Sequence, residues 1–204
     1  MESFFQRVSG FWPAGRRDLH WHILPTLQEA AALAAPYEGI YRPGLVRVPL
    51  QWQHCTLLHA VGLAPEDVDT DALVADARGR LAAVEPFTLT FDRPSVGTVA
   101  VEISGWPGRP AADLVDTLTQ ATLRTGAACR IAPSASPHTS IAYTGAGAEA
   151  LERAELAAAL AGIDGPLSST VHVDRVHLVA QWHDGAHIQW EQIATVPLGW
   201  ELTA

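Results

Sequence analysis

The chain of 204 residues contains no lysine, since all thirteen of its basic residues are arginine. Chemistry that needs a lysine amine, such as a lysyl-nucleotidyl intermediate or a Schiff base, therefore has no residue to carry it. This absence excludes the usual mechanism of ATP-driven ligases. The 22 acidic residues outnumber the basic ones, and the net charge of −9 argues against a protein that grips long stretches of nucleic-acid backbone.

Cysteines are also scarce. Cys55 and Cys129 show no CxxC spacing, and Cys55 lies in an apolar segment, so the pattern favours buried thiols over a disulfide. No run approaches the roughly 18 apolar residues of a membrane-spanning helix. The start, MESFFQRVSGFW, lacks the features of a signal peptide. We therefore expect a cytoplasmic protein that does not contact a membrane.

The composition is that of a globular protein, with 48% hydrophobic and 17% charged residues. The length suits one domain over residues 1–204, formed by two intimately packed lobes. We expect it to be a monomer.

Hydrophobic periodicity and turn signals predict an element order that is close to one pattern written twice. The predicted elements are a strand at 19–24, a helix at 27–35, a strand region at 45–60, a helix at 65–86, a hairpin of 87–91 and 98–104, a helix at 111–125, a strand at 138–143, a helix at about 147–161, and a hairpin of 170–182 and 187–196. This order predicts a pseudo-twofold α+β fold.

Two short motifs occupy equivalent places in the two halves, His54-Cys55-Thr56 and His138-Thr139-Ser140. Residues two apart in a strand point to the same face. Each motif therefore presents an imidazole beside a hydroxyl. One such motif is a weak signal, but two on matching strands are far more specific.

A pair of histidines suits phosphodiester cleavage, in which one group removes a proton from the nucleophile and another gives one to the leaving oxygen. Because a histidine has an unperturbed pKa of about 6.5, one ring can be neutral while the other is protonated. The hydroxyls of Thr56 and Ser140 can donate hydrogen bonds to phosphate oxygens. The sequence thus predicts His54 and His138 as catalytic residues, Thr56 and Ser140 as substrate-binding residues, and no cofactor.

His20 and His22 share a strand face at a spacing that metal sites also use. No further ligand can be placed beside them, so we favour a place in the lining of the site or a structural role, and expect no metal. The other five histidines are expected to be solvated or hydrogen-bonded: His59, His172, His177, His183 and His187.

Arginine and aromatic residues offer additional candidates. Arg47 and Arg130 lie close in sequence to the motifs and could reach a phosphate, but a solvated surface position explains them equally well. Trp52, Trp182 and Tyr143 could stack on a nucleobase. Core packing is the usual fate of such side chains, and we count none of these residues in the site.

With both motifs followed by a hydrophobic residue, Leu57 and Ile141, the sequence resembles the 2H phosphoesterase superfamily. The nearest likeness is to its 2′,5′ RNA ligase or RNA 2′,3′-cyclic phosphodiesterase group, and includes Pro137 before the second histidine. The resemblance implies a bilobal fold of two antiparallel sheets with helices on the outside and a central cleft. It also implies ATP-independent opening of a 2′,3′-cyclic phosphate to a 2′-phosphate, or reversible 2′-5′ joining of RNA ends.

By that resemblance His54 would be the proton donor and His138 the proton acceptor, although the likeness of the two halves permits the reverse. The RNA-acting pattern often has arginine close after each motif, whereas this chain has Leu58 and His59, then Ala142 and Tyr143. A small nucleotide or an RNA end is therefore the expected substrate. The alternatives are a non-catalytic module that binds a nucleotide or phosphorylated metabolite, and a metal-dependent hydrolase.

Overall fold

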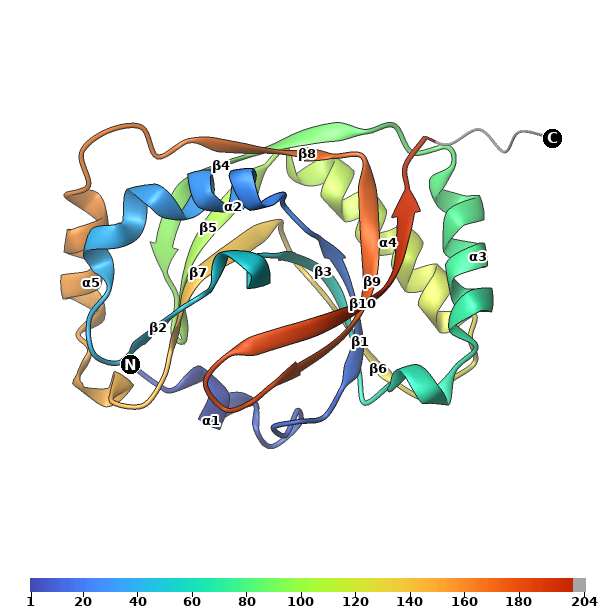
Figure 1. The fold of residues 1–204 in the computed structure, drawn as a ribbon, viewed down its shortest axis with the longest axis horizontal. Helices are drawn as coiled ribbons and strands as arrows, with labels where there is room; N and C mark the ends of the chain where they lie inside the picture. Colours follow the sequence, from blue (N-terminus) through green and yellow to red (C-terminus); the bar gives the residue numbers. More distant parts are fainter. Residues whose placement is uncertain (200–204) are drawn as a thin grey trace.

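The computed structural model describes residues 1–199. Figure 1 shows the elements, in chain order α1 (Phe4–Val8), β1 (Asp18–Ile23), α2 (Leu27–Ala34), η1 (Ala35–Ile40), β2 (Leu45–Arg47), η2 (Leu50–Trp52), β3 (Cys55–Val61), η3 (Pro65–Asp67), α3 (Thr70–Leu81), β4 (Phe87–Val96), β5 (Ala100–Trp106), α4 (Gly108–Leu123), β6 (Arg130–Pro133), β7 (His138–Thr144), η4 (Ala148–Ala150), α5 (Arg153–Ala161), β8 (Ser169–Val173), β9 (Arg175–His183) and β10 (Ile188–Pro197).

The strands form two five-stranded sheets in which every pairing is antiparallel. The first sheet has the order β6-β3-β1-β9-β10, and the second has the order β2-β7-β5-β4-β8. The two orders correspond position by position, with β3 matching β7 and β6 matching β2. The expected α+β fold of two antiparallel sheets with pseudo-twofold symmetry is confirmed.

Both motif strands begin where the chain crosses from one sheet to the other. The chain leaves β2, which pairs with β7 in the second sheet, and enters the first sheet as β3. It later leaves β6, which pairs with β3 in the first sheet, and enters the second sheet as β7. His54 directly precedes β3 and His138 is the first residue of β7, so each histidine lies at a crossing.

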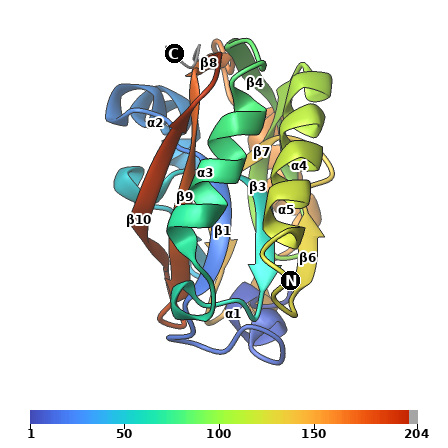
Figure 2. The same cartoon turned by 90° about the vertical axis from the view of Figure 1, so that its right-hand side faces the viewer.

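Helices cover the outer faces of the sheets. Figure 2 shows α3 and α4 in front of the first sheet, while α2 contacts β8 and α5 contacts β4 of the second. On β1, Leu19, Trp21 and Ile23 join the main hydrophobic core, so His20 and His22 point to the opposite side. We call the surface of each sheet that points toward the other sheet its inner face.

Side-chain caps decide where two of the helices begin. Thr26 accepts a hydrogen bond from the backbone of Glu29, whose carboxylate accepts one from the backbone of Thr26, so α2 starts where the sequence predicted. The predicted helix at 65–86 was wrong at its start. Asp69 accepts a hydrogen bond of 2.9 Å from the backbone N–H of Ala72 and caps α3, while residues 65–67 form a separate 3₁₀ turn.

The predicted strand at 170–182 was also wrong, because it is two strands in different sheets. β8 pairs with β4 in the second sheet, and after Asp174 the chain continues as β9 in the first. The hydrophobic positions shift by one across the break, from Val171 and Val173 to Val176 and Leu178, with the polar pair 174–175 between them. The predicted hairpin at Asp184 and Gly185 is confirmed, and Gly185 adopts a φ of 95°. The sequence did not predict α1 or β6.

Both cysteines are free thiols, with Cys55 buried and Cys129 partly buried. Within residues 1–199, no helix combines the length and the apolar composition that crossing a membrane requires.

Candidate active site

The two motif histidines are held in the same way. His54 Nδ1 lies 2.8 Å from the carbonyl oxygen of Trp52, and His138 Nδ1 lies 3.0 Å from that of Ser136. Since a carbonyl oxygen only accepts hydrogen bonds, each Nδ1 carries a hydrogen. In the neutral ring, Nε2 is then the nitrogen with the free lone pair. Both histidines therefore present the nitrogen that can take up a proton.

A buried hydrogen bond joins the two motifs directly. The Thr139 hydroxyl donates to Gln53 Oε1 over 2.9 Å, and both side chains are buried. The bond connects the residue after His138 to the residue before His54. The motif strands β3 and β7 also contact each other. The structure thus brings together the two motifs that the sequence paired.

His54 is buried, with 7% of its surface exposed. Burial lowers the pKa of His54 to about 4, and the charge of His138 lowers it as well, whereas the hydrogen bond to Trp52 opposes this shift. Near pH 7, His54 is neutral and able to accept a proton.

His138 has a different environment. Its side chain is 34% exposed, and its Nε2 lies 3.9 Å from Glu102 Oε1. Glu102 pairs with Ser140 across β5 and β7, so its carboxylate reaches the same inner face. A carboxylate at this distance attracts a protonated imidazole. The sequence did not predict a role for Glu102, because the polar face of residues 98–104 was recognisable but its neighbouring strand was not.

Thr56 and Ser140 lie two residues after their histidines, on the same inner faces. In β7 the pairing with β5 is regular from His138 to Ser140, so both side chains point to one face. In β3 Thr56 pairs with His22 of β1, which points to the inner face. A pocket of about 280 Å³ lies beside Thr56. The loop before His138 and the first turns of α4 complete its wall, through Leu57, Gly108, Arg109, Ala111, Ala112, Val115, Ser134, Ala135, Ser136 and Pro137. Of the first motif, only Thr56 lines this pocket, and neither motif histidine does.

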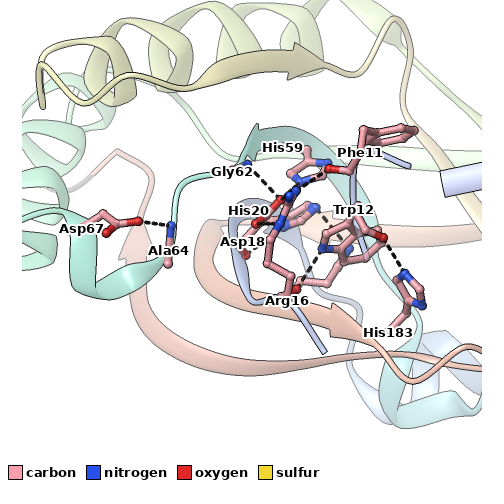
Figure 3. A network of polar contacts seen from close by, with 11 residues as sticks. Phe11, Trp12, Arg16, Asp18, His20, His59, Gly62, Ala64, Asp67 and His183 are labelled. Atoms are coloured by element: carbon pink, nitrogen blue, oxygen red, sulfur yellow. Dashed lines mark hydrogen bonds and ion pairs between the residues drawn. The ribbon is translucent and has the colours of Figure 1, made fainter. Parts of the chain in front are cut away.

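A polar network lies beside the site on the first sheet (Figure 3). The buried Asp18 carboxylate accepts hydrogen bonds from His59 Nε2 at 2.8 Å, Arg16 Nε at 2.8 Å and the backbone N–H of Gly62 at 3.0 Å. Burial raises the pKa of Asp18, but these three partners together bring it below its usual value. The ring of His20 stacks on His59 at 3.9 Å. His20 and His59 are thus hydrogen-bonded structural residues.

The other histidine of β1 occupies a different place. The His22 ring stacks on the His54 ring with centroids 4.5 Å apart and an angle of 19° between the planes. Trp190 of β10 stands with its ring nearly perpendicular to both. Trp52 in turn contacts Trp190 at 4.8 Å. The sequence did not predict a role for Trp190, because alternation alone does not show which residue lies beside a given strand residue.

The N-terminal segment fills part of the space between the inner faces. Phe4 and Phe5 pack against Tyr143 of β7, and Trp12 packs against His183 of β9. These side chains belong to a second hydrophobic cluster, separate from the main core: Phe5, Val8, Trp12, Val48, Ala100, Tyr143 and Ile188. Tyr143 is therefore covered by the chain itself.

The arginines near the motifs are engaged elsewhere. Arg47 forms an ion pair with Glu38 and lies over the ring of Tyr41. Arg130 lies over the ring of Phe11, with its guanidinium carbon 5.4 Å from the ring centre. Neither guanidinium is directed to a motif histidine.

The remaining candidates are accounted for by local contacts. Trp182 stacks under Arg17. His183 Nε2 donates to the carbonyl of Trp12 at 2.8 Å, and His177 Nδ1 is 3.1 Å from the Thr195 hydroxyl. His172 is exposed and His187 lies near Asp184. Among residues 1–199, no three His, Cys, Asp or Glu side chains are grouped so that they could hold a metal ion.

Comparison with known proteins connects this arrangement to one family. The sequence profile of the 2′-5′ RNA ligase superfamily matches residues 26–185. No curated protein matches the chain in sequence.

Several solved structures share the fold. E. coli LigT complexed with NADP⁺ is 17% identical, with a TM-score of 0.67 over 90% of this chain and 98% of LigT. TT0787 of Thermus thermophilus is 15% identical, with a TM-score of 0.67 over 90% of this chain and 99% of TT0787. A structure described as a phosphoesterase is 19% identical, with a TM-score of 0.66 over 90% of this chain and 98% of that protein. At these identities, the likeness shows a common fold.

Proposed function

Since the chain belongs to the 2′-5′ RNA ligase superfamily of 2H phosphoesterases, we propose that it is a metal-independent phosphodiesterase that opens 2′,3′-cyclic phosphates by His/His acid-base catalysis. The observation that carries the proposal is the equivalent hydrogen bonding of His54 and His138. Each ring has its Nδ1 hydrogen bonded to a carbonyl two residues earlier, which leaves Nε2 free. Proton transfer at two sides of a phosphate needs two such nitrogens.

The two environments support a division of roles. Because the pKa of the buried His54 is about 4, its neutral ring is the proton acceptor in the resting protein. His138, which is partly exposed and lies 3.9 Å from the Glu102 carboxylate, is the proton donor. This assignment reverses the roles that the family resemblance implies, as the pseudo-twofold symmetry permits.

In the proposed reaction, His54 Nε2 removes a proton from a water molecule whose oxygen attacks the phosphorus. The bond between phosphorus and the 3′ oxygen breaks, and that oxygen keeps the bonding electrons and takes a proton from His138. The products are a 2′-phosphate and a 3′-hydroxyl. The Thr56 and Ser140 hydroxyls donate hydrogen bonds to the non-bridging oxygens, where charge increases in the transition state.

The proposed substrate is a nucleotide or the terminal nucleotide of an RNA. The pocket beside Thr56 can take a small organic group, and we assign the nucleoside to it. The net charge of −9, together with the engagement of Arg47 and Arg130 in other contacts, disfavours binding along an RNA backbone.

The proposal is tested with a panel of cyclic phosphates in the presence of EDTA. The panel contains 2′,3′-cyclic nucleotides, RNA ending in a cyclic phosphate, ADP-ribose cyclic phosphate and 2′-5′-linked oligonucleotides. We expect turnover of a 2′,3′-cyclic nucleotide that resists EDTA and disappears in the variant His54→Ala/His138→Ala. His172→Ala, which changes an exposed histidine away from the motifs, is the control and should keep wild-type activity.

Two other outcomes of these experiments would assign a different function to the protein. Tight binding across the panel without any product would make the protein a nucleotide-binding module. Stoichiometric zinc in the purified protein, with activity lost on chelation, would make it a metal-dependent hydrolase.

A further inference from the structure

His22 is a fully buried imidazole that lies directly against the ring of His54. It is 0% exposed, on β1, and pairs in register with Thr56 of the first motif. The two rings stack with centroids 4.5 Å apart and planes 19° from parallel. The strand pairing that places His22 beside Thr56 therefore also places its ring face against the proposed proton acceptor.

Neither ring nitrogen of His22 has a hydrogen-bond partner within residues 1–199. His20, two residues earlier on the same face, differs in this respect. Its Nδ1 lies 3.1 Å from the carbonyl of Asp18, and its Nε2 lies 3.2 Å from the amide nitrogen of Gln181. Buried polar groups are normally paired, and leaving them unpaired costs free energy. His22 instead makes ring contacts, because it stacks face to face on His54 and meets His20 and Trp190 at steeper angles.

The His22 ring covers one face of the His54 ring. The hydrogen bond to Trp52 holds the His54 ring at one atom, Nδ1, and does not by itself prevent the ring from tilting. His22 lies against one face, and Trp190 stands at 5.0 Å with an interplanar angle of 72°. Tilting of the His54 ring toward His22 would require the buried His22 ring to move.

We propose that His22 is a positioning residue. Its ring face fixes the plane of the His54 ring and excludes water from the side of that ring that it covers. The inference rests on the proposed function of His54 as proton acceptor. It assigns the role to the flat shape of the His22 ring rather than to its nitrogens.

Water exclusion links His22 to the titration of His54. Burial is the main cause of the low pKa of His54, so a cavity that admits water beside the ring would raise that pKa toward the ordinary value. The titratable groups near the stacked pair are histidines on four strands, with one carboxylate beyond them: His20 on β1, His59 on β3, His177 on β9, His138 on β7 and Glu102 on β5 near His138. The substitutions below leave all of them in place, apart from the His20 control.

The test compares variants that remove the ring with one that keeps a ring. His22→Ala opens space beside His54, and His22→Val does the same while keeping a side chain suited to a strand, so the test does not depend on one variant folding. His22→Phe keeps a flat ring without nitrogens. His20→Ala is the matched control, since it removes a buried histidine from the same face of the same strand.

Two readouts are needed. The first is kcat and KM for a 2′,3′-cyclic nucleotide, with the pH profile of kcat/KM. The second is the pKa of His54, measured by NMR on the isotope-labelled protein without substrate. The NMR titration reports on the contact between His22 and His54 whether or not the protein is a cyclic phosphodiesterase, so failure of the inference and failure of the proposed function are distinguishable.

We expect His22→Ala and His22→Val to lower kcat by about tenfold or more with little change in KM, because misplacement of a reacting group acts on the chemical step. In both variants, the acid limb of kcat/KM and the His54 pKa should move up by about one pH unit or more. His22→Phe should keep kcat within about threefold of wild type. His20→Ala should lower the melting temperature without moving the His54 pKa.

Two results would overturn the inference. An unchanged His54 pKa in the folded variants without a ring would show that His22 does not shield His54. An activity of His22→Phe as low as that of His22→Ala would assign the role to the nitrogens.

Discussion

The Thr139 hydroxyl donates a 2.9 Å hydrogen bond to Gln53 Oε1, and this buried bond joins the two motif strands beside their histidines. Gln53 precedes His54, and Thr139 follows His138. Because the strands belong to different sheets, the bond connects the two halves of the proposed catalytic pair. The separation of the histidines therefore depends on a side-chain contact between the sheets.

Replacement of Thr139 by valine keeps its shape and removes the donor. The buried Gln53 oxygen then lacks a partner, and the free energy of unfolding should fall by about 1–3 kcal/mol. We also expect kcat for a 2′,3′-cyclic nucleotide to fall, since proton transfer depends on the placement of both rings. Chemical denaturation and steady-state kinetics measure the two effects.

The control for this variant is Thr117→Val, which removes a hydrogen bond from the Thr117 hydroxyl to a backbone carbonyl within α4. It should leave kcat unchanged. Equal kcat in the wild type and in Thr139→Val would show that the connection between the sheets does not serve the reaction.

Replacement of Glu102 by glutamine removes the carboxylate that lies 3.9 Å from His138 Nε2. Both side chains are about one-third exposed, so solvent screens the pair and we expect an effect of about 1 kcal/mol. This corresponds to a roughly fivefold lower kcat/KM. Glu149→Gln on η4 is the control, and equal activity in Glu102→Gln and the control would contradict the role of Glu102.

Stability should fall as the pH falls below neutral. Burial lowers the pKa of four histidines, His20, His22, His54 and His177, below the ordinary 6.5. As the pH falls below about 6.5, the unfolded chain therefore binds more protons than the folded one, and stability present at pH 7 is lost on the way to the folded pKa values. His54, with a pKa of about 4, accounts for about 3 kcal/mol of this loss at pH 4.

Urea denaturation at pH 7, 6 and 5 measures this loss. The variant His54→Gln, which cannot titrate in this range, should lose less stability over the same interval. A free energy of unfolding that stays constant between pH 7 and pH 5 would contradict the low pKa values of the buried histidines.

Asp18 holds the network beside the site through His59, Arg16 and Gly62. The substitution Asp18→Asn removes a buried charge that pairs with Arg16, and we expect it to cost about 3 kcal/mol of folding free energy. Asp76→Asn breaks the more exposed ion pair with Arg80 on α3 and should cost less than about 1 kcal/mol. Similar losses in the two variants would show that burial of Asp18 does not set its contribution.

The fold was predictable where local pattern determines it. The spacing of two within a strand placed each motif histidine on the same face as its hydroxyl, and the repeated element order indicated the pseudo-twofold symmetry. The same spacing placed His20 and His22 together. The spacing could not show that the His22 ring contacts His54 while the His20 ring contacts His59. These contacts depend on the register between β1 and β3, which shifts between Trp21 and His22.

Contacts between distant strands were not predictable from alternation. Glu102 and Trp190 reach the motif histidines through sheet neighbours that lie far away in sequence. The division of residues 170–182 between two sheets does leave a local mark, because the hydrophobic alternation shifts by one residue where Asp174 and Arg175 separate Val173 from Val176. The prediction of one continuous strand overlooked this shift. The packing of the N-terminal aromatics against Tyr143 likewise depends on the assembled sheets.

The most direct test of the account is the rate of hydrolysis of a 2′,3′-cyclic nucleotide in EDTA by the single variants His54→Ala and His138→Ala. General acid-base catalysis by two groups predicts that each variant loses about 10²–10⁴-fold in kcat while remaining folded. Wild-type kcat in either folded variant would contradict the account.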